Sequence, residues 1–478
     1  MGLWTRKPIS ELAAHTMPEG HALKRILGPW DLVLLGIGAV IGAGLFSITG
    51  IAAAENAGPA ITIAFLIAAL GCFFAGLCYC ELAGMIPISG SAYTYAYATM
   101  GELVAWMVGW SLILEYALGS ATVSISWSAY MVSMLHDLGI YLPLKLVASP
   151  WQPIHLADGT AVYGWINLPS LLIVTAISAL LIRGIKESSF FNTIIVLIKV
   201  SAVLVFIFLG FFYINPENYH PFIPSNTGDY GHFGWSGIFR AAGVLFFAYI
   251  GFDAVSTASQ EAKDPQRSIP MGILGSLVIC TILYVLFGFV LTGLVNYKEL
   301  HVAAPVALAV SKTPFLWLGW IIKLAVLAGL TSVILVMLLG QSRIFYAMSR
   351  DRLLPKCFSE IHPIFHTPWR SNLILMVFVG LIGAFAPISA VGHMTSIGTL
   401  LAFTIVCMGV LILRYTDPQL HRPFRITYAP LVSILGILVC LVMMFSLDQD
   451  AWWRLVIWLG IGLIIYLSYG RKNVTSSS

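Results

Sequence analysis

Three ionisable side chains stand inside long apolar runs, where they could do chemistry. Glu115 lies 14 residues past Gly101 and Lys199 lies nine residues past Phe190, so in helices they sit about 21 Å and about 13 Å into their runs. Asp253 lies within a third apolar stretch. Charged groups at such a depth in a membrane are costly and mark paths for substrates, ions or protons. We therefore expect these three residues to be functional.

The main chain offers a second kind of chemistry where a helix is interrupted. Gly36, Gly38, Gly42 and Gly44 fall within nine residues of the first apolar run, and each lowers helix propensity by about 1 kcal/mol relative to Ala. Small residues also let two helices pack closely, which is the simpler interpretation. Because these glycines lie on more than one helix face, we favour an unwound segment. A second interruption is predicted at 246–253, where a glycine and an acid lie within a span.

Two interrupted helices at matching positions in two halves are typical of an inverted-repeat transporter. Unwound backbone leaves N–H and C=O groups without partners in the helix. The N–H groups at the new helix N-terminus attract a carboxylate, and the free carbonyls accept hydrogen bonds from an ammonium group. Two such breaks side by side can therefore hold a zwitterionic amino acid without a charged side chain.

The elements that must position these groups are membrane helices. The chain has 478 residues, 59% of them hydrophobic and 10% charged, and its mean hydropathy is +0.90. Soluble domains have about 25% charged residues, so a solvated multidomain enzyme, a nucleic-acid binder and a disordered chain are excluded. The net charge of +4 is too small and too dispersed to indicate a nucleic-acid partner.

Twelve apolar runs are long enough to be spanning helices, and helices are expected because lipid offers the backbone no hydrogen-bond partner. They lie near 30–54, 59–86, 101–134, 166–183, 190–213, 236–258, 270–295, 315–345, 371–387, 391–413, 429–447 and 451–469. Placing the N-terminus inside puts 18 Lys and Arg residues on the inner side and 4 on the outer side. This bias predicts a multi-pass protein of the cell (inner) membrane with both termini cytoplasmic.

The sequence lacks the motifs that an intramembrane enzyme would need for zinc or ATP chemistry. The sequence has no HExxH zinc motif and no phosphate-binding loop. Six of the seven cysteines lie in apolar runs, and none forms a CxxC pair, so they are interpreted as packing residues. We expect no cofactor, no metal site and no catalytic residue.

Four stretches resemble the amino acid–polyamine–organocation (APC) superfamily of transporters, and the later two resemble its cationic amino acid transporter (CAT) branch, which has bacterial members. They are GAVIGAGLF at 38–46, CYCELAGMIPISGSAYTYAYATMGELVAWMVGW at 78–110, FFAYIGFDAVSTASQEAKDPQRSIP at 246–270 and GQSRIFYAMSRDRLLPK at 340–356. The resemblance covers nearly the whole chain in order.

The resemblance implies an all-α membrane protein with the LeuT-like fold, in which twelve transmembrane helices form a 5+5 inverted repeat plus two extra helices and helices 1 and 6 are broken. The implied divisions are a cytoplasmic N-terminal tail at 1–29, repeat one at 30–213, repeat two at 236–413, the two last helices at 429–469 and a cytoplasmic tail at 470–478.

The resemblance also implies a substrate site at the two breaks. The amides of Ala43 and Gly44 would face the substrate carboxylate, and four carbonyls would face its amine. Phe247 would act as a gate, and Gly44→Val would block binding sterically. Tyr284 and Met337 also match pocket positions of the family, and simple core packing is the alternative interpretation of both. The implied substrate-binding residues are Val40, Ile41, Ala43, Gly44, Phe247, Ala248, Ile250, Tyr284 and Met337, of which Val40, Phe247, Ala248 and Ile250 supply the carbonyls.

Lys199 is the residue that the resemblance assigns to proton coupling, because a lysine on helix five replaces a bound cation in proton-coupled relatives. Its ammonium group would meet carbonyls near Ile37 and Gly38 and the hydroxyls of Thr331 or Ser332. The alternative is a permanently charged lysine that pins helix five to helix one.

The two buried acids have several open roles. Glu115 and Asp253 could pair with the lysine, relay its proton, recognise a basic substrate side chain or make structural hydrogen bonds. Met337 is bulky and apolar, so it favours small or neutral amino acids, while Glu115 leaves a cationic substrate open.

The predicted function is inward transport of L-amino acids by alternating access, coupled to protons. The rivals are an amino-acid exchanger of the same fold, a transporter specific for cationic amino acids, an intramembrane enzyme and a nutrient sensor. Expected partners are the L-amino acid, protons and membrane lipids, and a small membrane accessory subunit is left open.

Overall fold

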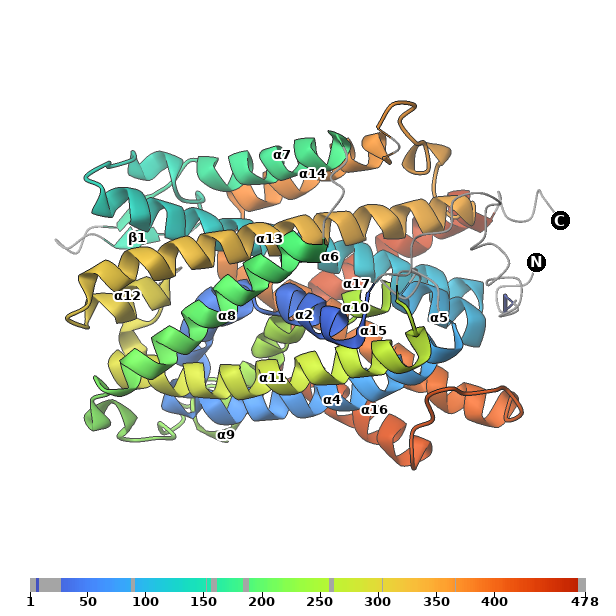
Figure 1. Ribbon diagram of the computed structural model, residues 1–478, viewed down its shortest axis with the longest axis horizontal. Helices are drawn as coiled ribbons and strands as arrows, with labels where there is room; N and C mark the ends of the chain where they lie inside the picture. The colour runs from blue at the N-terminus through green and yellow to red at the C-terminus, as the bar shows by residue number, and fades with distance from the viewer. Residues whose placement is uncertain are drawn as a thin grey trace.

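The computed structural model describes residues 6–7, 27–86, 91–151, 153–155, 161–183, 189–257, 262–302, 304–365 and 367–471. Long helices run side by side along the length of the molecule (Figure 1). Most of the two tails predicted at 1–29 and 470–478 lies outside the described residues.

The described first half consists of helices and one two-stranded hairpin, which lies in the segment between α6 and α7. They are α2 (Pro29–Val40), α3 (Thr49–Ala52), α4 (Ile61–Met85), α5 (Ser91–Thr99), α6 (Glu102–Asp137), α7 (Leu168–Arg183) and α8 (Ser189–Phe211), and the strands are β1 (Pro153–His155) and β2 (Ala161–Tyr163). The strands pair antiparallel, with Pro153 opposite Tyr163. This hairpin and the short helix α5 were not predicted, because each lies between apolar runs.

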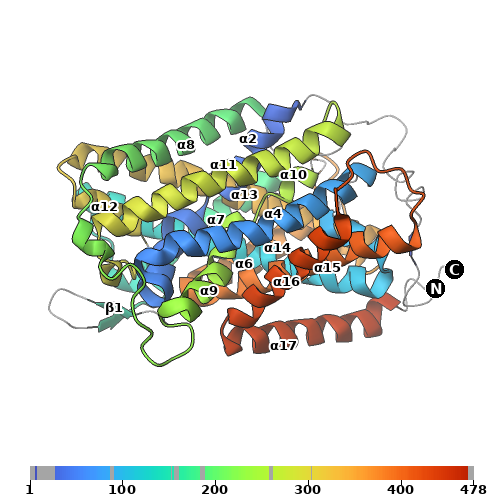
Figure 2. The same cartoon turned by 90° about the horizontal axis from the view of Figure 1, so that it is seen from below.

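The second half begins with the short helix α9 (Gly234–Leu245), and α10 (Ala254–Thr257) follows it. The others are α11 (Pro265–Leu294), α12 (Pro305–Ser311), α13 (Leu316–Arg350), α14 (Trp369–Phe385), α15 (Ile388–Thr416), α16 (Ala429–Ser446) and α17 (Gln449–Ile465). Seen from below, α16 and α17 lie on one side of the molecule, beside α4 and α15 (Figure 2).

Nine helical stretches of the described chain are long and apolar enough to cross a membrane. Each of the twelve predicted runs overlaps helix, but the two counts differ for a structural reason. Gly44–Met85 is one continuous stretch of 42 residues that joins the end of the first run to the second. The remaining apolar helices, α2, α7 and α14, have 12, 16 and 17 residues, so they are shorter than a full span.

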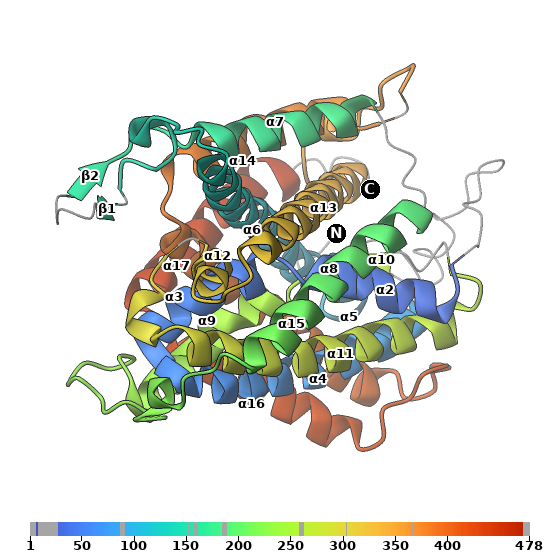
Figure 3. The same ribbon diagram turned by 60° about the vertical axis from the view of Figure 1, so that its left-hand side comes forward.

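The core gathers around α6, which packs against α13, α15, α14 and α7. On the other side α11 packs against both α2 and α4, and α8 lies beside α2 and α13 (Figure 3). Large aromatic side chains fill the centre, where Phe65, Tyr249 and Tyr284 lie within 6.5 Å of one another between ring centroids. The two interrupted helices each pack against continuous ones, α2 against α11, α8 and α13 and α9 against α4 and α16.

Residues near the two ends of the chain meet at the same end of the bundle. Lys7 Nζ lies 2.8 Å from the Asp351 carboxylate, just after α13. Arg6 lies 3.6 Å from the Asp417 carboxylate, just after α15. A Cβ atom on Gly470 would lie 3.4 Å from the Leu353 carbonyl oxygen. The described parts of both ends are thus on one side of the molecule.

Candidate functional site

The first predicted helix is interrupted at its glycine run. Helix α2 ends at Val40, and Ile41 is extended with ψ of 101°. Helical structure resumes with a π-helix at Gly44–Ile48, and the Leu45 amide bonds to the Gly42 carbonyl instead of continuing the α-helical ladder. The carbonyls of Gly38, Val40 and Ile41 therefore accept hydrogen bonds from side chains of other helices.

The second interruption follows α9. Phe246–Tyr249 forms a turn of 3-10 helix, and Ile250 is extended with ψ of 135°. Gly251 has φ of +116°, a conformation that L-residues rarely adopt, and α10 begins only at Ala254. The glycine and acid that indicated this break in the sequence lie at the point where the chain turns.

The two breaks touch each other. A Cβ atom on Gly44 would lie 2.3 Å from Ala248 Cα, and one on Gly251 would lie 2.8 Å from the Ala39 carbonyl oxygen. Neither glycine can gain a side chain unless one segment moves. The main chains of the two interrupted helices thus approach as closely as glycine permits, which the sequence pattern alone did not show.

Tyr284 joins the breaks through its hydroxyl group. Its Oη atom lies 2.9 Å from both the Val40 and the Ala248 carbonyl oxygens. A phenol carries one proton, so it donates to these two acceptors in turn. The Phe247 carbonyl accepts instead from the Ile250 amide within its own turn. Two of the four carbonyls that the resemblance placed around the substrate amine therefore converge on one polar side chain of α11.

Lys199 is fully buried, and within the described residues its ammonium group donates hydrogen bonds to three main-chain carbonyls. Nζ lies 2.6 Å from the Gly38 oxygen, 3.0 Å from the Ile41 oxygen and 3.5 Å from the Gly329 oxygen. Gly329 on α13 makes room for the lysine, because a Cβ atom there would lie 2.7 Å from Lys199 Cδ. Lys199 thus joins α8 to the first break and to α13.

The Gly38 carbonyl is the expected neighbour that this lysine meets, whereas the other three expected neighbours are engaged elsewhere. The Thr331 hydroxyl donates to the Leu327 carbonyl and accepts from the indole of Trp127. The Ser332 hydroxyl donates to the Gly329 carbonyl, and the Ile37 carbonyl accepts from the Ile41 amide. Threonine and serine return hydrogen bonds to their own helix when its carbonyls lie within reach, so the carbonyl of Gly329 faces Lys199 instead.

The two acids form a separate cluster. The Asp253 carboxylate accepts hydrogen bonds from the Tyr116 hydroxyl at 2.9 Å and from the Ser91 hydroxyl at 3.4 Å. Glu115 is 1% exposed, and it neighbours Asp253 and the Thr399 hydroxyl. Neither acid forms an ion pair with Lys199 in the described chain, so the pairing considered from the sequence is not present in this structure.

Met337 and Phe247 lie opposite a glycine of α6. A Cβ atom on Gly119 would lie 2.9 Å from Met337 Sδ and 3.9 Å from Phe247 Cε2. Sequence reasoning missed Gly119, although it lies four residues after Glu115 and hence on the same helix face. It also missed Tyr116, Ser91 and Gly329, which only gain a role through their neighbours in space.

Comparison with known proteins agrees with the motifs. Residues 27–466 match the sequence model of the family described as amino acid permease. The chain is 43% identical over 472 residues to the branched-chain amino acid permease BcaP of Bacillus subtilis (strain 168), covering 98% of each protein. It is 40% identical over 471 residues to the methylthioribose transporter of the same strain, again covering 98% of each.

A plant relative shows the same similarity over a shorter length. The chain is 36% identical over 400 residues to the vacuolar cationic amino acid transporter 4 of Arabidopsis thaliana, which covers 84% of this chain and 65% of the relative. The resemblance predicted from the four motifs is confirmed, and the relatives are transporters and not enzymes.

Proposed function

The chain belongs to the amino acid permease family, and from this premise we propose that it moves L-amino acids inward across the cell membrane by alternating access. The observation that carries the proposal is the contact between two broken helices, where Tyr284 lies 2.9 Å from one carbonyl of each. Main-chain groups released from helices at one point suit a small zwitterion, because opposite charges on one carbon find donors and acceptors together.

The proposed architecture is the LeuT-like inverted repeat with twelve spans and both termini cytoplasmic. The two interruptions support it, because they fall in the first and sixth of the predicted runs. The meeting of both chain ends at one end of the bundle is consistent with an even number of crossings.

The proposed grip on the substrate uses both sides of the breaks. The amides of Ala43 and Gly44, at the start of the resumed helix, bind the carboxylate. The carbonyls of Val40 and Ala248 accept from the ammonium group, which carries three N–H donors where Tyr284 offers one hydroxyl proton. The substrate amine therefore satisfies both carbonyls together, and the tyrosine hydroxyl gives way to it.

The side chain of the substrate is proposed to lie among Phe247, Met337 and Gly119. All three are uncharged, which favours small or medium apolar side chains such as those that the name of BcaP specifies for that relative. Cationic amino acids are the alternative, supported by the CAT relatives and by the nearby Glu115. Because one relative is a methylthioribose transporter, this uncharged thiosugar must be tested as a substrate as well.

Proton coupling is assigned to Lys199. A charged ammonium group holds the carbonyls of Gly38, Ile41 and Gly329 together, and loss of its proton removes that attraction next to the first break. Protonation can thus be linked to opening of the site. Glu115 and Asp253 are proposed to relay the proton or to respond to it from their own cluster. The second candidate is exchange without an ion gradient, in which Lys199 stays charged.

The test is uptake into proteoliposomes with and without an imposed pH gradient. Labelled leucine, alanine, lysine, arginine and methylthioribose define the substrate, and Lys199→Met tests coupling. We expect the variant to lose pH-driven accumulation and to keep counterflow, while the exposed Lys298→Met control behaves as the parent. Accumulation by Lys199→Met equal to the parent's would contradict proton coupling through this residue. Counterflow without any pH dependence in the parent would identify an exchanger.

A further inference from the structure

A cavity of about 390 Å³ lies at the end of the bundle that holds both described chain ends. Arg414, at the end of α15, and Arg425, in the loop that follows, line it together with residues 426–430 at the start of α16. None of its lining residues belongs to the two helix breaks, and neither the proposed transport site nor the family resemblance assigns it a role.

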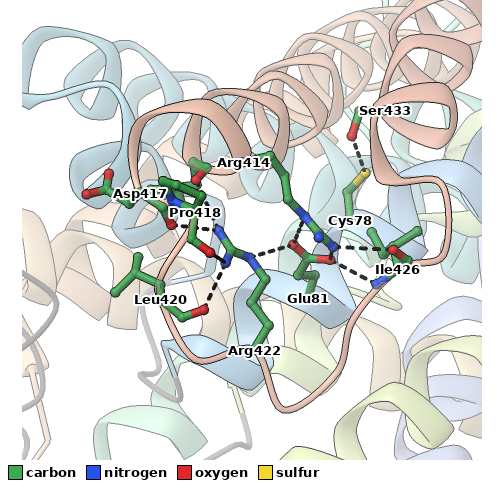
Figure 4. A network of polar contacts seen from close by, with 10 residues as sticks. Cys78, Glu81, Arg414, Asp417, Pro418, Leu420, Arg422, Ile426 and Ser433 are labelled. Carbon is green, nitrogen blue, oxygen red and sulfur yellow. Dashed lines mark hydrogen bonds and ion pairs between the residues drawn. The ribbon is translucent and has the colours of Figure 1, made fainter.

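A network of polar contacts around Glu81 lies beside this cavity, and Arg414 belongs to both (Figure 4). Arg414 Nε donates to Glu81 Oε1 at 2.9 Å, and Arg422 Nε lies 3.3 Å from the same oxygen. Arg425 is exposed and adds a third guanidinium group. The other acid nearby, Asp417, pairs with Arg6. Arg414 and Arg422 thus share one carboxylate, and Arg425 is a further positive charge that lines the cavity.

The loop that leads into the cavity is held by side-chain hydrogen bonds. Arg422 donates to the carbonyls of Leu413, Asp417, Pro418 and Leu420, which close the C-terminal end of α15. The Ile426 amide donates to Glu81 Oε2 at 3.0 Å. The loop between α15 and α16 is therefore fixed to α4, and Arg414 and Arg422 are held in place before any ligand arrives.

An apolar stripe leads away from the cavity along α16. Leu431, Ile434, Leu438 and Val442 are 57%, 45%, 53% and 49% exposed, and their spacing places them on one face of the helix. Tyr428, 77% exposed, stands between this stripe and the arginines, as aromatic side chains do at the boundary between lipid and water. The stripe faces the hydrocarbon of the membrane when the helix spans it.

We propose that this cavity binds the phosphate headgroup of an anionic phospholipid whose acyl chain lies along the stripe of α16. Guanidinium groups suit phosphate oxygens, and the N-terminus of α16 adds a partial positive charge at the same point. A free phosphate ion has no acyl chain that could cover the apolar stripe, so a phospholipid is the favoured occupant. Because Arg414 and Glu81 also join α15 to α4, the bound lipid stabilises the packing of α4, α15 and α16.

The test compares lipid retention by the full-length protein in detergent, measured by native mass spectrometry after addition of phosphatidylglycerol or phosphatidylcholine. Arg425→Gln removes one exposed charge of the cavity, and Arg350→Gln removes an exposed arginine at the end of α13 as the matched control. We expect Arg425→Gln to lower retention of phosphatidylglycerol about fivefold, as one basic group near an anionic headgroup contributes. Arg350→Gln should retain it as the parent does.

Three results would overturn the proposal. The first is equal retention of phosphatidylglycerol by Arg425→Gln and the parent. The second is retention of phosphatidylcholine as strong as that of phosphatidylglycerol. The third is complete displacement of the lipid by excess inorganic phosphate, which would identify a free anion site. The thermal unfolding midpoint of Arg425→Gln, measured without lipid, should equal that of the parent, because its side chain is exposed.

Discussion

The contact between Gly44 and Ala248 allows a sharp test of the proposed site. A Cβ atom on Gly44 would lie 2.3 Å from Ala248 Cα, 2.6 Å from its Cβ and 2.9 Å from its amide nitrogen. Ordinary contacts of a Cβ atom begin near 3.4 Å, so Gly44→Ala must separate the two broken segments by about 1 Å. Gly42 is a matched control, because the three atoms nearest to a Cβ atom there all belong to Val333 and the nearest lies at 3.4 Å, an ordinary contact.

Overpacking of this kind raises the free energy by about 1–3 kcal/mol. If substrate binding requires the close approach of the two breaks, that energy appears as an affinity about 5- to 150-fold weaker. We expect this loss for Gly44→Ala and a larger one for Gly44→Val, whereas Gly42→Ala should bind nearly as the parent does. Neither change touches a charged group, so the pH dependence of residual uptake should stay the same.

The assay is the substrate-induced rise in thermal unfolding midpoint of purified protein, together with the concentration dependence of uptake in proteoliposomes. Comparing the midpoints without substrate separates general destabilisation from loss of binding. The reasoning is refuted if Gly44→Ala binds substrate with the affinity of the parent. It is equally refuted if Gly42→Ala loses as much affinity as Gly44→Ala, because steric contact between the two breaks would then not be the cause.

Three further changes test the polar contacts. Tyr284→Phe removes a hydroxyl that lies 2.9 Å from one carbonyl of each break, so it should destabilise the protein by about 1–3 kcal/mol in thermal unfolding. The control is the exposed Tyr230→Phe, which should leave the stability unchanged. Equal destabilisation by the two variants would count against a stabilising role of the Tyr284 hydrogen bonds. Glu81→Gln breaks a pair in which the acid is 1% exposed and should destabilise by about 3–5 kcal/mol. Glu299→Gln, in a pair about half exposed, should stay within about 0.5 kcal/mol, and a similar small effect of Glu81→Gln would refute the argument. The hydrogen bond that the His301 imidazole donates to the Glu55 carboxylate raises the pKa of His301 above its usual 6.5. The stability that this pair adds is therefore fully present below about pH 6.5 and is lost as pH rises through the raised pKa. The difference in unfolding midpoint between parent and His301→Gln should shrink over that range, and a difference independent of pH would exclude the pair as its source.

Local features of the sequence predicted the helices and their interruptions. Apolar runs of about 20 residues mark the spans, because the backbone in lipid must bond within its own helix. Gly42, Gly44 and Gly251 mark the interruptions, because the conformational preference of glycine acts at the residue itself. The short helices α5 and α12 escaped prediction, since they lie in loops where tertiary packing and not hydropathy decides the conformation.

Side-chain partners at the site depended on contacts between distant segments. Glu115, Asp253 and Lys199 were recognisable as buried charges from their surroundings in sequence. Their separation into two clusters was not, because α6 and α8 approach the breaks from different sides. Tyr284 looked like either a pocket residue or a core residue, and only its position opposite two released carbonyls distinguished a polar role.

Sequence by itself therefore determined which segments are helices in a membrane, where two of them come apart, and which charges must be buried. Tertiary structure alone decided what the released groups meet: Lys199 reaches carbonyls 161 and 158 residues earlier in the chain and another 130 residues later. The physical reason is the distance along the chain over which each kind of interaction acts. Helix formation and its interruption are governed by neighbours within a few residues, whereas a hydrogen bond to a freed carbonyl depends on how whole helices pack.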